Sequence, residues 1–449
     1  MALDPRTARD LRVLWHPCTQ MHDHAAQVPL LHVAAAEGAW LVAQDGRRYL
    51  DAISSWWTCL FGHRHPHIVA ALKDQLDTLD HVLLAGCSHE PAVRLAEVLV
   101  AHAPPGLDKV FYADNGSAAT EVALKMSLHY WRNVGEPRRQ KLVALCNSYH
   151  GETIGALSVS DVGLYRTPYA PLLFDPLLVP PPDRFQRKPG QSEAEQVASC
   201  LDALSRTLEQ HAGEVAAMIM EPLVQCAGSM RMYPASYLVG VRRLCDVHGV
   251  HLIADEIAVG MARTGPVWAC THAGIAPDFL LTSKGLTGGT LPLAAVLTRE
   301  VVYAAFYAEY RAQRAFLHSH SYTGNPLACR AALATFELLD APGFAADHVA
   351  RIACMNRLLA PFAGQPQVGE VRQTGMIGAI ELLADVPGRR AFPADDRRGL
   401  RARLHALSRG VLLRPLGDVL YVMPPYCLDE AQWRLLGEVL GEAVEVAVV

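Results

Sequence analysis

Two charged residues follow apolar segments, and their chemistry is complementary. Lys284 comes after the apolar run "DFLLTS" (278–283) and opens a glycine-rich loop. Asp255 ends "VHLIAD" (250–255), 29 residues earlier. Taken singly, Lys284 could be a solvated loop residue and Asp255 the N-cap of a helix. If both segments are parallel strands, the amine and the carboxylate meet at one edge of a sheet.

An amine and a carboxylate at one sheet edge suit pyridoxal phosphate (PLP). The amine holds the cofactor aldehyde as a Schiff base, and the carboxylate keeps the pyridine nitrogen protonated, so that the ring accepts electrons from a carbanion. The phosphate needs N–H groups at a helix N-terminus. The segment "ADNGSAATEVAL" offers Gly116 and Ser117 where a strand turns into a helix. An aromatic ring to stack on the pyridine could come from "SYHGET", as Tyr149 or His150.

Competing motifs are absent from the sequence. It contains no GxGxxG, GxxxxGKS/T, HExxH or GxSxG pattern. "FGHRHPHI" (61–68) carries three histidines, but its proline predicts a loop. We therefore expect no metal ligands.

The segments that would position these residues alternate between strands and helices. Six short apolar runs predict strands: residues 109–114, 141–146, 215–220, 250–255, 278–283 and 293–298. Helical stretches such as 235–249 separate several of them. Apolar strands alternating with helices are typical of a mostly parallel sheet with both faces covered, so we expect an α/β fold.

The pattern of predicted helices and strands changes after about residue 330. Helices with Arg on one face, then "EVRQTGMIGAIEL" and "RGVLLRPLGDVLYVMPP", suggest a smaller α+β domain. The segment "GAWLVAQDGRRYLDA" predicts a hairpin that could join it. We expect a large domain over 60–330 and a small domain built from 1–59 and 331–449. The proline-rich stretch 176–193 is expected to be a surface excursion.

Composition limits the class of protein. The chain has 40 Lys plus Arg against 45 Asp plus Glu, a net charge of −5, which does not suggest a nucleic-acid binder. No apolar run approaches the ~18 residues of a membrane span. The eleven cysteines contain no CxxC pair and are interpreted as reduced thiols. We expect a cytoplasmic protein with neither nucleic-acid nor membrane partners.

The chain resembles the class III aminotransferases of fold type I over nearly its whole length. The resemblance is carried by "DGRRYLDAISSWWTCLFGHRHP", "NGSAATEVALKMSLHYW", "YHGETIGALSVSD", "LIADEIAVGMARTG", "SKGLTGG" and "HSYTGNPLAC". It implies a large sheet domain, a smaller α+β domain from the two chain ends, and PLP as cofactor. The "WHP", "SSWW" and "RPLG…MPPY" segments point to the member of biotin biosynthesis that transfers an amino group from S-adenosylmethionine to 8-amino-7-oxononanoate.

The resemblance also implies residue roles. Lys284 would bind the cofactor and move the substrate proton, Asp255 would pair with the ring nitrogen, and Tyr149 would stack on the ring. These three are the expected catalytic residues. The expected cofactor contacts are Gly116, Ser117, Tyr149, His150, Glu221, Asp255, Ile257, Lys284, Ser321 and Tyr322. Glu221 could equally be a structural carboxylate.

For the substrate, the expected contacts are Trp56, Tyr149, Arg263, Ser319 and Arg414. Trp56 would form an aromatic wall against the aliphatic chain, whereas the neighbouring Trp57 is expected in the core. Arg414 would bind the substrate carboxylate bidentately, unless it forms a surface ion pair.

The segment "HSYTGNP" aligns with one that reaches the neighbouring subunit's phosphate in this family, so we expect a homodimer with shared active sites. Cys18 stands where the family often has Tyr, and Glu152 where Asp is frequent, which leaves the amino donor open. The alternatives are lysine as donor, an ω-amino acid:pyruvate aminotransferase, and a decayed scaffold without cofactor.

Overall fold

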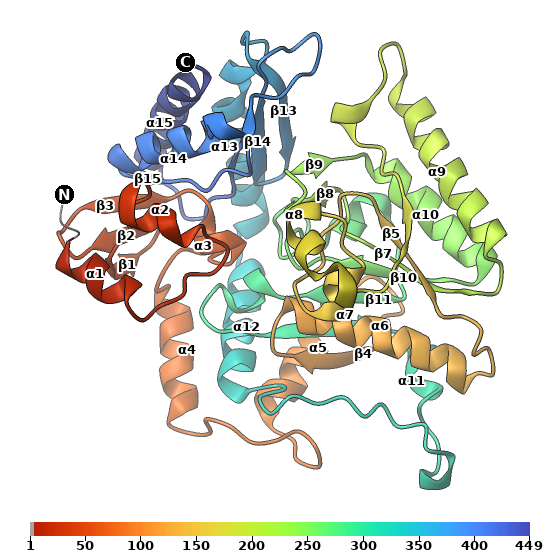
Figure 1. Ribbon diagram of the computed structural model, residues 1–449. Helices are drawn as coiled ribbons and strands as arrows, with labels where there is room; N and C mark the ends of the chain where they lie inside the picture. Colours follow the sequence, from red (N-terminus) through yellow and green to blue (C-terminus); the bar gives the residue numbers. More distant parts are fainter. Residues whose placement is uncertain (1–3) are drawn as a thin grey trace.

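The computed structural model describes residues 4–449, whose largest unit is a seven-stranded sheet (Figure 1). Its strands run in the order β4 (Lys109–Ala113), β12 (Ala294–Thr298), β11 (Phe279–Thr282), β10 (His251–Asp255), β7 (Val215–Met220), β5 (Lys141–Leu145) and β6 (Leu177–Val179). Strand β12 is antiparallel to both neighbours, and every other pair is parallel. The predicted α/β fold with a mostly parallel sheet is confirmed.

Both faces of this sheet are covered, as its strands show. All six residues of β7 are buried. Ala217 and Ile219 pack in the core with α6 (Gly116–Asn133), whereas Met218 and Met220 pack in the core with α9 (Glu193–Gln210) and α10 (Ala235–His248). Side chains alternate between the faces of a strand, so two covered faces need the continuous apolar run of "VAAMIM".

The six predicted strands of the large sheet are confirmed, and two smaller predictions are wrong. The stretch 176–193 is not only a surface excursion, because Leu177–Val179 forms the edge strand β6. An edge is where a strand next to prolines is tolerated. Pro66 does not extend the loop after "FGHRH" but begins helix α4 (Pro66–Leu76), since proline at the first helical position needs no N–H partner.

The two ends of the chain lie side by side (Figure 1). A four-stranded sheet joins β1 (Val33–Glu37), β2 (Trp40–Ala43), β3 (Arg48–Asp51) and the late strand β15 (Val411–Leu412). The predicted hairpin is therefore confirmed as β2 and β3. A three-stranded sheet contains β13 (Val368–Thr374), β14 (Ile377–Leu382) and β16 (Val419–Val422). The division into domains at residues 60 and 330 stays a prediction.

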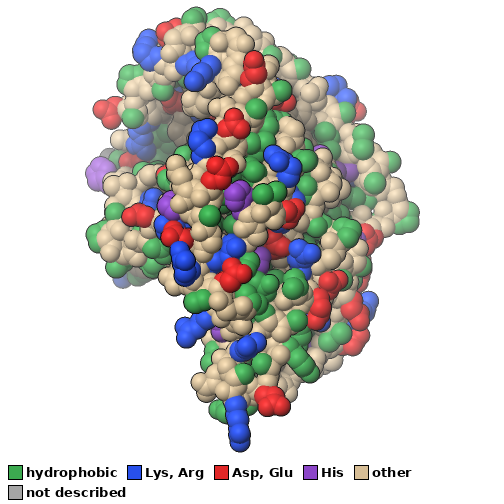
Figure 2. Space-filling model, turned by 90° about the vertical axis from the view of Figure 1, so that its right-hand side faces the viewer, with side chains coloured by type: hydrophobic (Ala, Val, Ile, Leu, Met, Phe, Trp, Pro, Cys, Tyr) green, Lys and Arg blue, Asp and Glu red, His purple; other side chains and the backbone are tan. Residues whose placement is uncertain are grey.

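The other elements complete the covering layers. They are α1 (Pro5–Leu11), α2 (Met21–Ala26), α3 (Ser54–Trp57), α5 (Glu90–His102), α7 (Ile154–Ser158), α8 (Gly163–Arg166), β8 (Val224–Gln225), β9 (Arg231–Met232), α11 (Glu300–Ala304), α12 (Pro326–Leu339), α13 (Phe344–Leu359), α14 (Arg398–Ser408) and α15 (Glu430–Val448). Among residues 4–449, no helix is long and apolar enough to cross a membrane. On the face shown in Figure 2, acidic and basic side chains are interspersed.

Candidate active site

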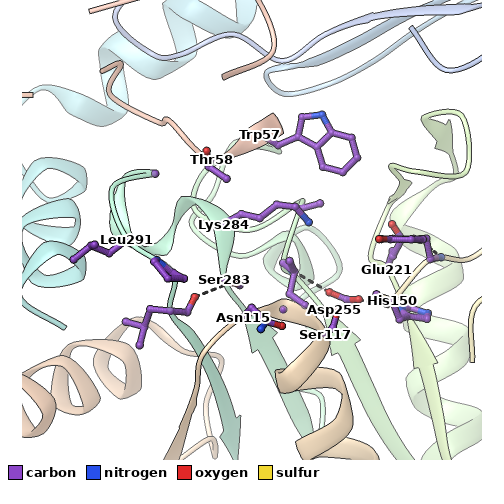
Figure 3. A pocket seen from close by; sticks show the side chains of 18 of the residues that line it. Trp57, Thr58, Asn115, Ser117, His150, Glu221, Asp255, Ser283, Lys284 and Leu291 are labelled. Carbon is purple, nitrogen blue, oxygen red and sulfur yellow. Dashed lines mark hydrogen bonds and ion pairs between the residues drawn. The ribbon is translucent and has the colours of Figure 1, made fainter. Parts of the chain in front are cut away.

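A cavity of about 510 Å³ opens at the carboxyl edge of the large sheet (Figure 3). Its walls come from the segments that follow β4, β5, β7, β10 and β11, together with the segment that precedes the antiparallel strand β12. The predicted residues that line it are Gly116, Ser117, Tyr149, His150, Glu221, Asp255, Ile257 and Lys284. Lys284 and Asp255 therefore lie at the same edge of the sheet, as predicted from the sequence.

Strand β11 ends at Thr282, and Lys284 follows it after a single residue, Ser283. The Lys284 backbone has φ of +46°, a left-handed conformation that costs a non-glycine residue about 1–2 kcal/mol. The half-buried side chain points between Trp57 and Asp255 (Figure 3), with Nζ 5.2 Å from the centre of the Trp57 ring. Burial lowers the pKa of Lys284, against the attraction of nearby acidic groups, of which Asp255 is the strongest. Burial therefore favours the neutral, nucleophilic amine.

Asp255 is buried at the end of β10 and is held from two sides. Its Oδ1 accepts a hydrogen bond from the Ile257 amide at 3.1 Å, which is the local contact expected of an Asp after a strand. Its Oδ2 lies 2.7 Å from Nδ1 of His150, which is also buried. The His150 backbone is fixed in turn by Thr120 and Ser160. The carboxylate thus has a fixed orientation at the floor of the cavity.

Glu221 follows β7 and supports the aromatic wall of the cavity. Its two carboxyl oxygens accept hydrogen bonds from the backbone amides of Tyr149 (3.0 Å) and Cys226 (2.9 Å). Burial, with the nearby charge of Asp255, raises the pKa of Glu221 to about 8. The Tyr149 hydroxyl donates to Glu152 at 2.9 Å. Glu221 and Glu152 therefore hold Tyr149 by its backbone and by its hydroxyl.

The N-terminus of α6 provides free backbone donors. The side chain of Asn115 caps the helix by accepting from the Ala118 amide at 3.0 Å, which leaves the amides of Gly116 and Ser117 at the open end. A Cβ at position 116 would lie 3.1 Å from the side chain of Ile257, so glycine keeps this approach open. Such a helix end is a ready anion site.

Trp57 lies in the core and also lines the cavity. Its Nε1 donates to the hydroxyl of Tyr421 at 3.1 Å. The four residues from Ser54 to Trp57 all have positive φ, between +44° and +75°. This left-handed turn places the two tryptophans differently. Trp57 is buried, and Trp56 keeps 39% of its surface exposed.

Arg414 and Trp56 lie together, and their roles as a carboxylate clamp and a substrate wall stay predictions. The guanidinium carbon lies 4.4 Å from the centre of the Trp56 ring. Nη2 of Arg414 donates to the backbone carbonyl of Cys18 at 2.8 Å. No ion pair with Arg414 occurs in the part of the chain that the structure describes, so the surface-pair alternative finds no partner there.

Trp56 and Arg414 do not line this cavity, and the other predicted residues also lie outside its wall. Arg263 is fully buried and donates to the carbonyl oxygens of Pro424 (2.7 Å) and Trp57 (3.4 Å), while its Nε has no partner among the described residues. Ser319, Ser321 and Tyr322 are exposed and do not line this cavity. Their contacts with substrate or cofactor stay predictions.

The residues present fit pyridoxal phosphate. Lys284 supplies an amine without a hydrogen-bond partner among residues 4–449, and Asp255 supplies a fixed carboxylate. Within the described residues, His150 Nε2 is buried without a hydrogen-bond partner, which leaves polar capacity beside that carboxylate. The amides of Gly116 and Ser117 form an anion cradle across the cavity. A volume of about 510 Å³ is within the range of small-molecule sites.

Two of the three histidines of "FGHRHPHI" pair with carboxylates. His63 pairs with Asp51 at 3.0 Å and His67 with Glu337 at 2.5 Å. Residues 4–449 contain no group of three or more His, Cys, Asp or Glu side chains placed to hold a metal ion.

Several lining residues escaped the sequence reasoning. They are Thr58, Asn115, Gly151, Ala258, Ser283 and the segment 289–293. Asn115 could have been found, since it directly precedes Gly116 in the expected phosphate motif. The segment 289–293 reaches the rim because β12 runs antiparallel, which an apolar run does not reveal.

Comparisons with known proteins agree with this geometry. The family model for aminotransferase class-III matches residues 21–444. The adenosylmethionine-8-amino-7-oxononanoate aminotransferase of Geobacter sulfurreducens is 41% identical over 98% of this chain and 98% of its own. The crystal structure of the enzyme of that name from Methanocaldococcus jannaschii has a TM-score of 0.92 at 35% identity, with 98% of each chain covered. An omega transaminase from Pseudomonas jessenii in complex with PMP has a TM-score of 0.94 at 26% identity, with 99% of this chain and 98% of that chain covered.

Proposed function

The chain belongs to the class III aminotransferases, which have fold type I and use PLP, and we propose that it transfers the amino group of S-adenosylmethionine to 8-amino-7-oxononanoate. The product is 7,8-diaminononanoate, a step of biotin biosynthesis. The observation that carries this assignment is full-length identity of about 40% to relatives with that name, combined with the Arg414 guanidinium over the Trp56 ring. The reaction is ping-pong, because donor and acceptor use one site in turn.

The bound cofactor supplies an aldehyde that condenses with amines and a ring that accepts electrons from a carbanion. Lys284 would supply the amine that holds this aldehyde, and its Nζ would move the proton at the substrate carbon. Burial lowers the pKa of Lys284, which favours the neutral form that this work requires. Asp255, fixed by His150, would face the ring nitrogen, and the Tyr149 ring and the aliphatic Ile257 side chain would enclose the two faces of the cofactor ring.

The acceptor is a long aliphatic keto acid, and the pair of Trp56 and Arg414 suits it. Trp56 offers an apolar face for the chain, and Arg414 offers a guanidinium for the terminal carboxylate. Arg263 and Ser319 remain proposed substrate contacts. The buried Arg263 donates to the Trp57 carbonyl, and its Nε has no hydrogen-bond partner among the described residues.

The spectrum of the PLP-loaded protein tests the assignment. Adding S-adenosylmethionine without acceptor should remove the visible band of lysine-bound cofactor and raise the band of pyridoxamine phosphate. Adding 8-amino-7-oxononanoate should then restore the first band. If the spectrum does not change with S-adenosylmethionine but changes with lysine, the proposed donor is wrong. The proposed acceptor, 8-amino-7-oxononanoate, would still stand.

Lysine as donor is the second candidate, because two positions that differ from the usual family pattern lie together. Cys18 and Glu152 are linked through Tyr165 and Tyr149, since the Cys18 thiol lies 3.6 Å from the Tyr165 hydroxyl and the two tyrosine rings are 5.5 Å apart. An ω-amino acid:pyruvate aminotransferase is less supported. Omega transaminases share the fold at 26–28% identity, below the 41% of the Geobacter relative.

A homodimer with shared active sites is part of the proposal. Ser319, Ser321 and Tyr322 are exposed, and apolar side chains close to them are exposed too, including Leu317 at 90%. In the dimer, these three residues would lie beside the cofactor phosphate in the neighbouring subunit's cavity. Light scattering should give twice the chain mass, and a monomer with full activity would contradict shared sites. We also propose a cytoplasmic enzyme, as expected for eleven free thiols.

A further inference from the structure

Two hydrogen-bond donors meet at Cys18, at the edge of the candidate site. The hydroxyl of Tyr165 lies 3.6 Å from the Cys18 sulfur, and Nη2 of Arg414 donates to the Cys18 carbonyl at 2.8 Å. Neither donor contacts a carboxylate in the part of the chain that the structure describes. The three residues come from segments far apart in sequence, so the fold brings these donors together.

Tyr165 is held in place by its ring rather than by its hydroxyl. It lies in the short helix α8, and its half-buried ring packs against Tyr149 with centres 5.5 Å apart and planes at 59°. Sulfur is a weak hydrogen-bond acceptor, so the phenol is poorly satisfied by Cys18. Burial, then the contact with Cys18, raises the pKa of Tyr165, so the hydroxyl keeps its proton and remains a donor.

Arg414 likewise makes fewer hydrogen bonds within the described residues than its guanidinium can donate. A guanidinium has five N–H donors, and the described structure uses the charged group only for the Cys18 carbonyl and the face of Trp56. A carboxylate accepts up to about four hydrogen bonds. A single carboxylate beside Cys18 would therefore use both the charged donor and the neutral one.

We propose that Tyr165 donates its hydroxyl to the substrate carboxylate that Arg414 binds, and so helps to select an acceptor that ends in a carboxylate. This inference rests on the proposed function. Cys18 links the two donors, because its thiol lies beside the Tyr165 hydroxyl and its carbonyl accepts from Arg414.

Equilibrium binding of nonanoate to the PLP-loaded enzyme tests the role of Tyr165 without turnover. Nonanoate has the chain and carboxylate of the acceptor but no amine or ketone, and its binding is followed by tryptophan fluorescence, since Trp56 lies beside Arg414. Tyr165→Phe removes one hydrogen bond to a charged group, so the Kd should rise about ten- to a hundredfold. The Kd of the neutral nonanamide should change by less than about twofold. Tyr169→Phe is the matched control, since that ring is 52% exposed.

A double-mutant cycle separates binding from structure. In an Arg414→Ala background, Tyr165→Phe should have little further effect on nonanoate, because the carboxylate is no longer held there. Equal nonanoate affinity in Tyr165→Phe and the unmodified enzyme would overturn the inference, as would equal losses for nonanoate and nonanamide. If nonanoate binding depends on Tyr165 but 8-amino-7-oxononanoate is not aminated, the subsite stands and the proposed function fails.

Discussion

Nδ1 of His150 lies 2.7 Å from Oδ2 of Asp255, and both side chains are buried. The pair sets the direction of the carboxylate that faces the cavity. The other carboxyl oxygen of Asp255 is occupied by the Ile257 amide, so both oxygens are fixed before any ligand enters. Such support is what keeps a catalytic group in its productive geometry.

Replacing His150 should therefore reduce activity through Asp255. In His150→Leu, Asp255 loses a hydrogen bond to a charged acceptor, and kcat should fall about ten- to a hundredfold. His150→Asn places an amide donor near the position of Nδ1 and should recover most of the loss. Steady-state kinetics of both variants checks this. Equal activity of the Leu and Asn variants would show that the contact does not orient Asp255.

Lys284→Ala should lower kcat at least about a thousandfold, because it removes both the amine that holds the cofactor and the proton carrier. Borohydride reduction followed by intact-mass measurement should add one cofactor to the unmodified enzyme and none to the variant. Lys73→Ala, at an exposed position of α4, is the control and should behave as the unmodified enzyme does. A labelled Lys284→Ala protein would place the covalent bond elsewhere.

Arg414→Ala should raise the KM for 8-amino-7-oxononanoate by about a hundredfold or more, since two hydrogen bonds to a carboxylate are lost. The donor half-reaction, followed by absorbance, should change much less. Arg434→Ala, an exposed partner of Glu430, controls for the change of net charge. A similar loss in both half-reactions would indicate that Arg414 supports the site as a whole.

The large sheet could be predicted because each strand carries its own signal. Runs such as "VAAMIM" are apolar at every position, and parallel strands that are buried on both faces require this. The positions of Lys284 and Asp255 follow, because parallel strands end at one edge. Strand β6 was missed because its three residues precede prolines and make no periodic pattern.

The rim contacts could not be predicted in the same way. Cys18 meets Tyr165 and Arg414 across separations of 147 and 396 residues, and no local pattern encodes such contacts. The turn from Ser54 to Trp57 is left-handed at four residues that are not glycine. Local preference opposes that conformation, so only the surrounding contacts explain it.

A buried ion pair lies beside this left-handed turn. Asp51 is buried, accepts from Ser55 Oγ at 2.7 Å and pairs with His63 Nε2 at 3.0 Å. Burial by itself would lower the pKa of His63. The hydrogen bonds of His63 to Asp51 and Cys59 outweigh burial and raise this pKa from its ordinary 6.5 to about 10. The folded pKa exceeds the unfolded one, so the pair's stabilisation is complete below pH 6.5 and disappears as the pH rises to about 10.

His63→Gln should therefore destabilise the protein most at about pH 6, by about 3 kcal/mol or more, since it leaves a buried carboxylate without its cation. The difference from the unmodified protein should shrink towards about pH 10. Denaturant unfolding at several pH values measures it. His67→Gln breaks an exposed pair with Glu337 and should cost at most about 1 kcal/mol. A His63→Gln effect that is independent of pH would mean that packing, rather than the charge of His63, holds the turn.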